Sequence, residues 1–369
     1  MAIVPLRARY LLSVVALTLF AIPAHAFLFV HITDTHLSAS GAGSYGTRGQ
    51  DTLRDLTAML PVIKPEFVLA TGDIADGGDE ASWKLFLEIT KDAPCPVYPV
   101  AGNHDWPPAE AWRRVFDSHH ITADCGDCTL IAISDSSGCA GERNWPEWGD
   151  YLEEQLKLAH ARGQKQFLIA MHHPLMAMSN PTFDSMPGWA SLGGEQALRV
   201  INLCARYGVK AHLGGHLHPI YDCYNSPGGV LSLAGPALGT SPNAPPGQFR
   251  LFSLEDGVLC WTEAVPGQWP VIAVIAPERN AQYSPVAAQD GQGKVIAKPF
   301  SPDPIISVTC TAPGKEPVEM APCGEGRYET LLAVGNTGLT WTTLTLSATD
   351  AAKRSVTIKY PVLVKPAEK

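Results

Sequence analysis

Five short blocks of the sequence contain residue types that bind metal ions. They are TDTH (33–36), GDIAD (72–76), GNHD (102–105), MHHP (171–174) and GGHLH (214–218). Their carboxylate, amide and imidazole groups suit Fe, Mn or Zn, and none of the blocks contains the thiolates of a closed structural zinc site. The blocks predict a site for two divalent or trivalent metal ions. Its candidate ligands are Asp34, His36, Asp73, Asn103, His172, His216 and His218.

Two metal ions about 3.5 to 4 Å apart need a shared ligand, and the two carboxylate oxygens of Asp73 could bridge them. Water held between two cations gives up a proton near neutral pH, because each cation stabilises hydroxide. The pKa of such water falls to about 7. A bridging hydroxide is a nucleophile, so the blocks predict a hydrolase.

Each block directly follows a short apolar run. The runs are FLFVHI (27–32), EFVLAT (66–71), VYPVA (97–101), QFLIA (166–170) and VKAHL (209–213). Apolar runs of this length, bounded by Gly, Asn and Asp, predict buried parallel strands. The carboxyl ends of such strands meet at one edge of a sheet, where sites form. Helices are predicted between the strands, over residues 51–63, 80–90, 109–118, 150–161 and 195–207.

In this order, the five blocks resemble the signature of the calcineurin-like metallophosphoesterase superfamily, which reads DxH, GDxxD, GNHD or GNHE, H and GHxH. The resemblance covers roughly residues 27 to 265. It implies a four-layer α/β/β/α sandwich that hydrolyses phosphate monoesters or diesters at a two-metal centre. It also implies two ligand sets joined by Asp73, which are Asp34, His36 and His218 for one ion and Asn103, His172 and His216 for the other.

The resemblance gives His104 a catalytic role without a metal. Its ring would lie over the phosphate, where it would stabilise charge or protonate the leaving oxygen, and Asp105 is expected to orient that ring. Asp76 stands where purple acid phosphatases have a tyrosinate iron ligand, so their iron chemistry is not expected. His173 is expected either to face the phosphate or to support His172.

The N-terminus has the pattern of an export signal. Arg7 and Arg9 form a basic segment, residues 11–22 are apolar, and residues 24–26 read AHA, a cleavage pattern. An uncleaved anchor would need about 20 apolar residues, and Pro23 interrupts the run. We therefore expect a signal peptide over residues 1–26, no membrane span after its removal, and a periplasmic or extracellular protein.

Export makes the nine cysteines informative, because an oxidising compartment lets thiols pair. Cys310 and Cys323 are predicted to form a disulfide, as the two cysteines of the C-terminal region. Cys125 and Cys128 flank Gly-Asp and are predicted to lie opposite each other across a two-residue hairpin turn. A zinc site is not expected there, because no second CxxC completes it.

Short strands follow the last block, over residues 220–224, 229–234, 249–254 and 258–265, and they are expected to complete the second sheet. A breaker, Pro266-Gly267, then marks a domain boundary. Beyond it, runs rich in Val, Ile and Thr predict a small all-β sandwich over residues 268–369. One stretch, 344–358, resembles the closing hairpin of immunoglobulin-like or fibronectin III-like modules of secreted enzymes.

The charge and composition of the sequence limit the classes of molecule that the protein is expected to bind. The formal net charge is −9 and the sequence has no Lys/Arg cluster, so no nucleic-acid-binding surface is predicted. A small phosphate ester is the expected partner, and residues 136–148 and 176–192 are expected to contact it. The residues suit monoesters and diesters alike, and they predict no oligomeric state. The alternative is a non-catalytic binding or adhesion protein that retains the fold, but such a protein would be expected to lack some of the ligands.

Overall fold

The computed structural model describes residues 27–105, 109–134, 145–175, 194–225, 230–240, 244–279, 285–286, 292–333 and 340–364. The expected signal peptide lies outside the described residues. So do residues 176–192 and most of 136–148, the two segments expected to contact substrate. Among the helices that the structure describes, none has the length and hydropathy of a membrane span.

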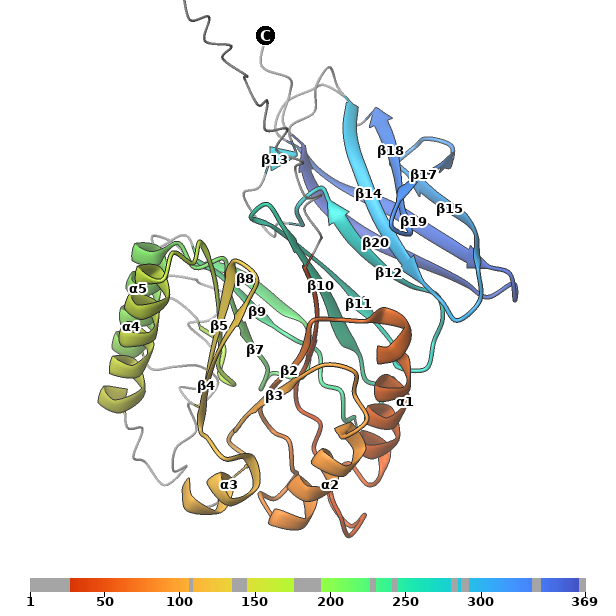
Figure 1. Ribbon diagram of the computed structural model, residues 1–369. Coiled ribbons are helices and arrows are strands. Elements are labelled where there is room, and N and C mark those ends of the chain that lie inside the picture. Colours follow the sequence, from red (N-terminus) through yellow and green to blue (C-terminus); the bar gives the residue numbers. More distant parts are fainter. Residues whose placement is uncertain are drawn as a thin grey trace, which may run out of the picture.

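Two β-sheets face each other in the N-terminal part of the chain (Figure 1). The first has the order β11-β10-β1-β2-β3, with β1 (Phe27–Ile32), β2 (Phe67–Thr71), β3 (Val97–Val100), β10 (Phe249–Glu255) and β11 (Val258–Ala264). The second has the order β4-β5-β6-β7-β9-β8, with β4 (His120–Cys125), β5 (Cys128–Ile133), β6 (Gln166–Ala170), β7 (Ala211–Gly214), β8 (Tyr221–Asn225) and β9 (Val230–Ala234). As predicted, β1, β2 and β3 are parallel, and so are β5, β6, β7 and β9.

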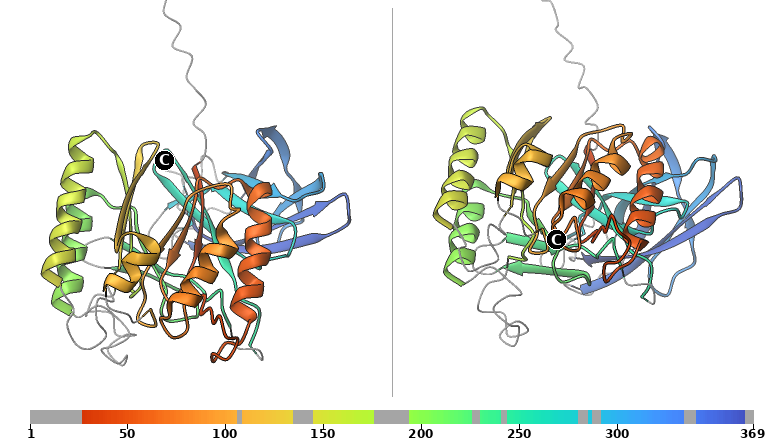
Figure 2. Two further views of the ribbon diagram at one scale, coloured as in Figure 1. Left: turned by 60° about the horizontal axis from the view of Figure 1, so that its bottom comes forward. Right: turned by 90° about the horizontal axis from the view of Figure 1, so that it is seen from below.

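Helices cover the outer face of each sheet (Figure 2). The helices α1 (Arg48–Ile63), α2 (Glu80–Thr90) and α3 (Ala109–Phe116) pack on the first sheet, while α4 (Trp145–Ala161) and α5 (Gly194–Tyr207) pack on the second. Alternation along β1 explains the layers, because Val30 faces the helices and Phe29 faces the other sheet. The predicted four-layer α/β/β/α sandwich is confirmed.

The last two strands of this part correct one expectation. Only β8 and β9 extend the second sheet, whereas β10 and β11 join the first sheet by antiparallel pairing of β10 with β1. Both faces of β10 are buried: Leu251 packs with the helices and Phe252 packs between the sheets. An apolar strand of this kind fits either sheet, so its sequence does not specify its partner.

The C-terminal part is an all-β sandwich, as predicted. One sheet has the order β12-β14-β18-β17, and the other has the order β13-β20-β19-β15-β16. Pairing is antiparallel except at the two-residue strand β13. The strands are β12 (Val271–Ala276), β13 (Pro285–Val286), β14 (Gln292–Phe300), β15 (Ile305–Thr311), β16 (Val318–Glu319), β17 (Ala321–Gly324), β18 (Arg327–Ala333), β19 (Thr340–Asp350) and β20 (Ser355–Val364).

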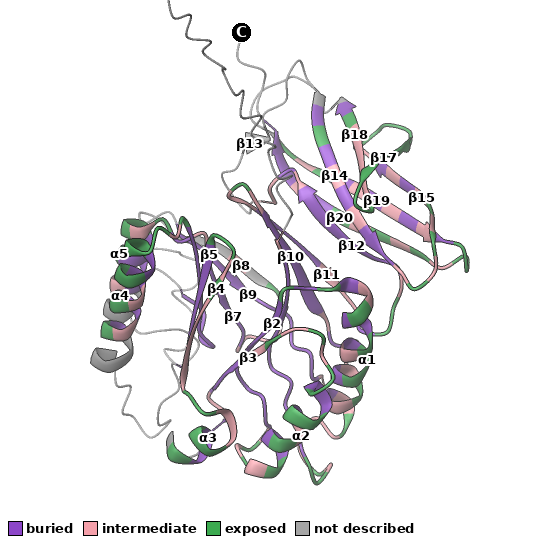
Figure 3. Ribbon diagram, viewed as in Figure 1, coloured by how far each residue is buried: buried purple, intermediate pink, exposed green. Residues whose placement is uncertain are grey.

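The two parts of the chain are joined through β12. Ile272 and Val274 face the sandwich core, while Ile275 packs with the helices of the first sheet. The hydroxyl of Thr262 on β11 donates to the Ile272 carbonyl at 2.6 Å. Figure 3 shows that β10, β11 and β12 are mostly buried. The boundary predicted at Pro266-Gly267 therefore lies between two β-strands, but residues from both sides of it pack into the same hydrophobic clusters.

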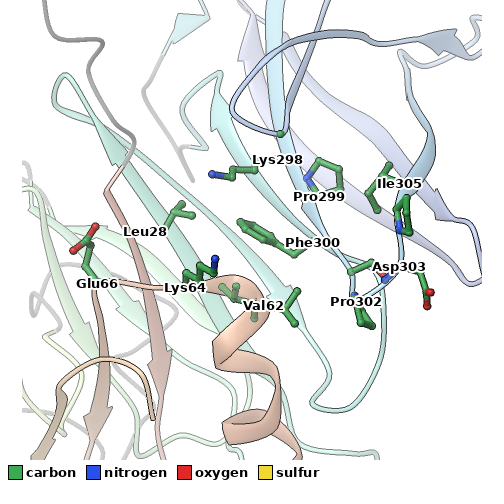
Figure 4. Close-up of a pocket in the computed structure, with 14 residues that line it drawn as sticks. Leu28, Val62, Lys64, Glu66, Lys298, Pro299, Phe300, Pro302, Asp303 and Ile305 are labelled. Atoms are coloured by element: carbon green, nitrogen blue, oxygen red, sulfur yellow. The ribbon is translucent and has the colours of Figure 1, made fainter.

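A cavity of about 500 Å³ lies at this junction (Figure 4). Leu28 and Glu66 line it from the first part of the chain, and Lys298 and Phe300 line it from the second. None of the seven candidate metal ligands lines this cavity. It is therefore a feature of the domain junction rather than part of the predicted site.

We expect Ile275→Ala to lower the free energy of unfolding by about 2–5 kcal/mol, because it leaves a cavity in a core shared by both parts. Ile306→Ala is the matched control. Ile306 is 50% exposed, so its loss should change stability by no more than about 0.5 kcal/mol. Urea unfolding followed by tryptophan fluorescence measures both variants. Equal stability of the two variants would show that β12 does not support the catalytic part.

The predicted disulfide between Cys310 and Cys323 is absent, since both cysteines are free. Cys310 lies in β15 and is buried in the sandwich core, whereas Cys323 lies in β17 of the opposite sheet and is exposed. Burial raises the pKa of the Cys310 thiol to about 12. The predicted hairpin turn is confirmed, because Cys125 pairs with Cys128, but these two thiols are also free.

Candidate metal centre

Turns after the strands bring the candidate ligands together, and most of these residues have an unusual backbone. Five candidate ligands have φ in the left-handed region: Asp34 (51°), His36 (46°), Asp73 (49°), His216 (70°) and His218 (67°). This region is uncommon for residues other than glycine, and such residues cluster at functional sites. Backbone hydrogen bonds hold the turns, including one from the Asp34 N–H to the Gly72 carbonyl at 3.0 Å.

The glycines of two blocks are required by close packing. A Cβ atom on Gly102 would lie 2.2 Å from Oδ1 of Asp73, and one on Gly72 would lie 2.4 Å from Nδ1 of His172. Gly72 also has φ of 93°, which side chains rarely allow. The glycines of GDIAD and GNHD therefore let the turns approach closely enough for their ligands to converge.

Asp34, His36 and His218 form the first cluster. The Nε2 atoms of the two histidines are 3.1 Å apart, and they lie 3.8 Å and 3.5 Å from Oδ1 of Asp34. Oδ2 of Asp34 accepts hydrogen bonds from the Thr33 hydroxyl and the His216 N–H, but Oδ1 is buried and has no hydrogen-bond partner among the described residues. A buried acceptor beside two imidazole nitrogens fits a cation.

Asp73, His172 and His216 form the second cluster. Nδ1 of His172 donates to the Thr71 carbonyl at 2.7 Å, so Nε2 of the neutral ring carries a lone pair. That Nε2 lies 3.3 Å from Oδ2 of Asp73 and 3.0 Å from Oδ1 of Asn103. In this tautomer no proton lies between Nε2 of His172 and Oδ2 of Asp73, so two electron-pair donors face each other. Such an arrangement again fits a cation bound between them.

Asp73 lies where the two clusters meet. Its Oδ2 is 3.3 Å from His172 and 3.9 Å from Nε2 of His36, while its Oδ1 accepts the N–H of His104 at 2.8 Å. Burial alone would raise the pKa of Asp73, but the nearby imidazoles of His172 and His36 and the hydrogen bond from the His104 backbone N–H hold it below its ordinary value. Burial dominates at Asp34, where it raises the pKa. Asp73 is thus favoured as a carboxylate between the two clusters.

The His36 ring contacts two residues, Tyr45 and Asp76, that were not predicted to belong to the site. Burial lowers the pKa of His36 to about 3, so its ring is neutral near pH 7 and can donate a lone pair. The Tyr45 ring stacks on it, with centroids 4.1 Å apart and planes 7° apart. Oδ1 of Asp76 lies 3.7 Å from Nδ1 of His36. Tyr45 lies in a Gly- and Ser-rich segment with no strand or helix pattern, so no sequence signal identified it.

His104 lies at the rim of the site, and its side chain is 40% exposed. Its Nδ1 donates to the backbone carbonyl of Asp76 at 3.0 Å, so any proton exchanged with a substrate would be on Nε2. The ring of His173 lies 4.6 Å from the His216 ring and 5.3 Å from the His172 ring, measured between centroids. His173 therefore lies beside the second cluster.

The expected role of Asp105 is wrong. Its carboxylate does not orient the His104 ring but accepts four N–H groups at 2.9 Å, from the backbones of Ile74, Ala75 and Gly102 and from the Trp83 indole. Burial and the charge of Asp73 raise the pKa of Asp105 to about 6, and these donors limit the rise. Asp105 is a positioning residue that ties the turn after β2 to the turn after β3.

Asp105→Asn should therefore destabilise the protein and misplace the ligands of both turns. An amide NH₂ would face N–H donors, and each buried polar group left unsatisfied costs about 1–3 kcal/mol. We expect lower thermal stability and weaker metal binding, measured by calorimetry and by elemental analysis after dialysis. Asp79→Asn is a control, since Asp79 caps α2 and the exchange tests an acidic residue outside the site. Unchanged metal affinity in a destabilised Asp105→Asn protein would contradict the positioning role.

The sequence of the chain is similar to those of two bacterial phosphodiesterases. The chain is 27% identical over 227 residues to a "Probable glycerophosphodiester phosphodiesterase" of Arcobacter nitrofigilis, covering 57% of this chain and 78% of that protein. It is 26% identical over 211 residues to a 3',5'-cyclic adenosine monophosphate phosphodiesterase of Pseudomonas aeruginosa. This match covers 54% of this chain and 72% of that protein. A dimetal phosphatase from Danio rerio is similar with a TM-score of 0.48 at 15% identity, over 65% of this chain and 99% of that one.

Residues 27–219 match the family described as calcineurin-like phosphoesterase, and they include all seven candidate ligands. This match spans more than half of the 369 residues. The chain therefore belongs to the calcineurin-like phosphoesterase family and is a hydrolase of phosphoric ester bonds.

Proposed function

We propose that this chain hydrolyses phosphate diesters at a two-metal centre. One ion would be held by Asp34, His36 and His218, the other by Asn103, His172 and His216, with Asp73 shared between them. The observation that carries the proposal is the short contact of 3.3 Å between two acceptors, Nε2 of His172 and Oδ2 of Asp73. In the other cluster, Oδ1 of Asp34 has no hydrogen-bond partner among the described residues. The donor set of imidazoles, carboxylates and one amide suits Fe, Mn or Zn.

When bound, two such ions lower the pKa of coordinated water and stabilise negative charge on the phosphoryl oxygens. The protein's own part is to fix the ligand tautomers and to place a proton. The Thr71 carbonyl fixes the His172 tautomer, and the Asp76 carbonyl leaves Nε2 of His104 for proton exchange. The diester preference is supported by the names of the two bacterial relatives, both of which are phosphodiesterases.

A rate panel on metal-reconstituted protein tests this function. It compares p-nitrophenyl phosphate with bis(p-nitrophenyl) phosphate, cyclic nucleotides and phospholipid headgroup esters, with elemental analysis of the same sample. We expect the diester kcat/KM to exceed the monoester value by at least about tenfold, a difference of 1.4 kcal/mol in activation free energy. A preference for the monoester would make the chain a phosphatase. No turnover of any ester with two equivalents of metal bound would support a non-catalytic binding protein.

We also propose that the chain is exported and that residues 1–26 are removed. The basic segment, the apolar run and the AHA pattern support this. Mass spectrometry of the natural protein should find Phe27 as its first residue. Detection of residues 1–26 in the mature protein would contradict cleavage.

A further inference from the structure

A cavity of about 730 Å³ opens beside the first ligand cluster. His218 belongs to that cluster and also lines the cavity, together with Tyr45, Pro219, Ile220, Pro245 and Pro246. Among the described residues that line it, none is Lys, Arg, Asp or Glu. The cavity is therefore an uncharged, mostly apolar space that shares a wall with the candidate metal centre.

Tyr45 forms the wall nearest the centre, and the turn that carries it is held in place. The Ser44 N–H donates to Oδ2 of Asp76 at 2.7 Å. Gly43 packs so closely on the same carboxylate that a Cβ atom there would lie 2.4 Å from Oδ2. One face of Tyr45 stacks on His36, and the residue also lines the cavity. The tyrosine thus connects the cluster to the cavity.

A second part of the cavity lining is also fixed by hydrogen bonds. Arg48 donates from its guanidinium to the Ala244 carbonyl at 2.8 Å, and the Thr240 hydroxyl donates to the Pro245 carbonyl at 2.9 Å. Gly247 packs against the Leu238 carbonyl, where a Cβ atom would lie at 1.8 Å. A wall with two prolines and these contacts loses little conformational freedom when a ligand binds.

We propose that this cavity binds one ester group of the substrate, that this group is uncharged and planar or apolar, and that Tyr45 determines specificity for it. The inference rests on the proposed function, since the phosphoryl group would lie at the centre that His218 shares with the cavity. A charged group here would lose water without gaining a charged partner, which is costly. An aromatic or other flat group would instead pack against Tyr45 and the proline rings.

Phenylphosphonate and methylphosphonate test the proposal, because each carries one organic group and neither needs to be hydrolysed. Their dissociation constants are measured by calorimetry on the metal-loaded protein, and turnover of bis(p-nitrophenyl) phosphate is measured on the same samples. We expect the full chain to bind phenylphosphonate about tenfold more tightly than methylphosphonate. Tyr45→Ala should bring this ratio close to one, and Tyr45→Phe should restore it.

Ile220→Ala is a second variant, which changes the cavity lining but leaves Tyr45 stacked on His36. It should also lower the preference for phenylphosphonate over methylphosphonate. Trp341→Ala is the matched control, since Trp341 is 47% exposed on β19 of the sandwich, and its ratio should match that of the natural chain. Equal binding of the two phosphonates with turnover intact would overturn the cavity assignment alone. No phosphonate binding and no turnover would overturn the proposed function as well.

Discussion

Asp73→Ala is expected to reduce bound metal from about two equivalents per chain to less than about one, because this carboxylate lies between the two ligand clusters and is proposed to bridge both ions. Its Oδ2 lies 3.3 Å from Nε2 of His172 and 3.9 Å from Nε2 of His36. Diester hydrolysis should fall by more than about 10²–10³-fold, the loss that follows removal of one electrostatic group from an active site. Elemental analysis and kcat for bis(p-nitrophenyl) phosphate measure the two effects.

Asp76→Asn is the matched control for the loss of a negative charge near the same histidines. Oδ2 of Asp76 accepts the Ser44 N–H, and an asparagine oxygen can still do so, so this variant should keep both ions. Chelation gives an independent readout. A ligand at 100 times its Kd stabilises a fold by about 2.7 kcal/mol, so a chelator should lower the Tm of the natural chain more than that of Asp73→Ala. Two equivalents of metal retained by Asp73→Ala would rule out the bridge.

The sequence predicted the strands that carry the site almost to the residue, because each is a buried apolar run that ends at a turn. The run 27–32 is β1, and the run 166–170 is β6. Alternation of faces then explains the four layers. The same reasoning could not place β10, since both of its faces are buried and its pairing with β1 is a contact between distant parts of the chain.

The candidate ligands were also predictable, because their types and order form a recognisable pattern at strand ends. The residues around them were not, since they act through contacts that no local pattern encodes. Asp105 accepts a hydrogen bond from a residue about 30 positions earlier in the sequence, and the hydrogen bond between Ser44 and Asp76 joins residues 32 positions apart. Spacing was equally uninformative for Cys310 and Cys323, because it does not reveal that they lie in opposite sheets of the sandwich.

His104→Ala is expected to keep both metal ions and to lose kcat. The backbone N–H of residue 104, which alanine retains, makes the hydrogen bond to Oδ1 of Asp73. The imidazole that alanine lacks is 40% exposed at the rim, and its plane is 86° from that of the His36 ring at a centroid distance of 4.9 Å. A proton donated from Nε2 to a departing alkoxide is worth about 10²–10⁴ in rate. The loss should be large for alkyl esters and small for p-nitrophenyl esters, whose leaving group needs no proton.

His104→Asn separates proton transfer from positioning. An asparagine amide can replace Nδ1 as the donor to the Asp76 carbonyl, which His104 contacts at 3.0 Å, but it has no counterpart of Nε2. If proton donation is the role, both variants should lose kcat with alkyl esters to a similar extent. If the role is to hold the turn through Asp76, asparagine should restore most of the rate. Equal losses for p-nitrophenyl and alkyl esters, with metal content intact, would exclude the acid role and leave stabilisation of phosphoryl charge or positioning, because neither depends on the pKa of the leaving group.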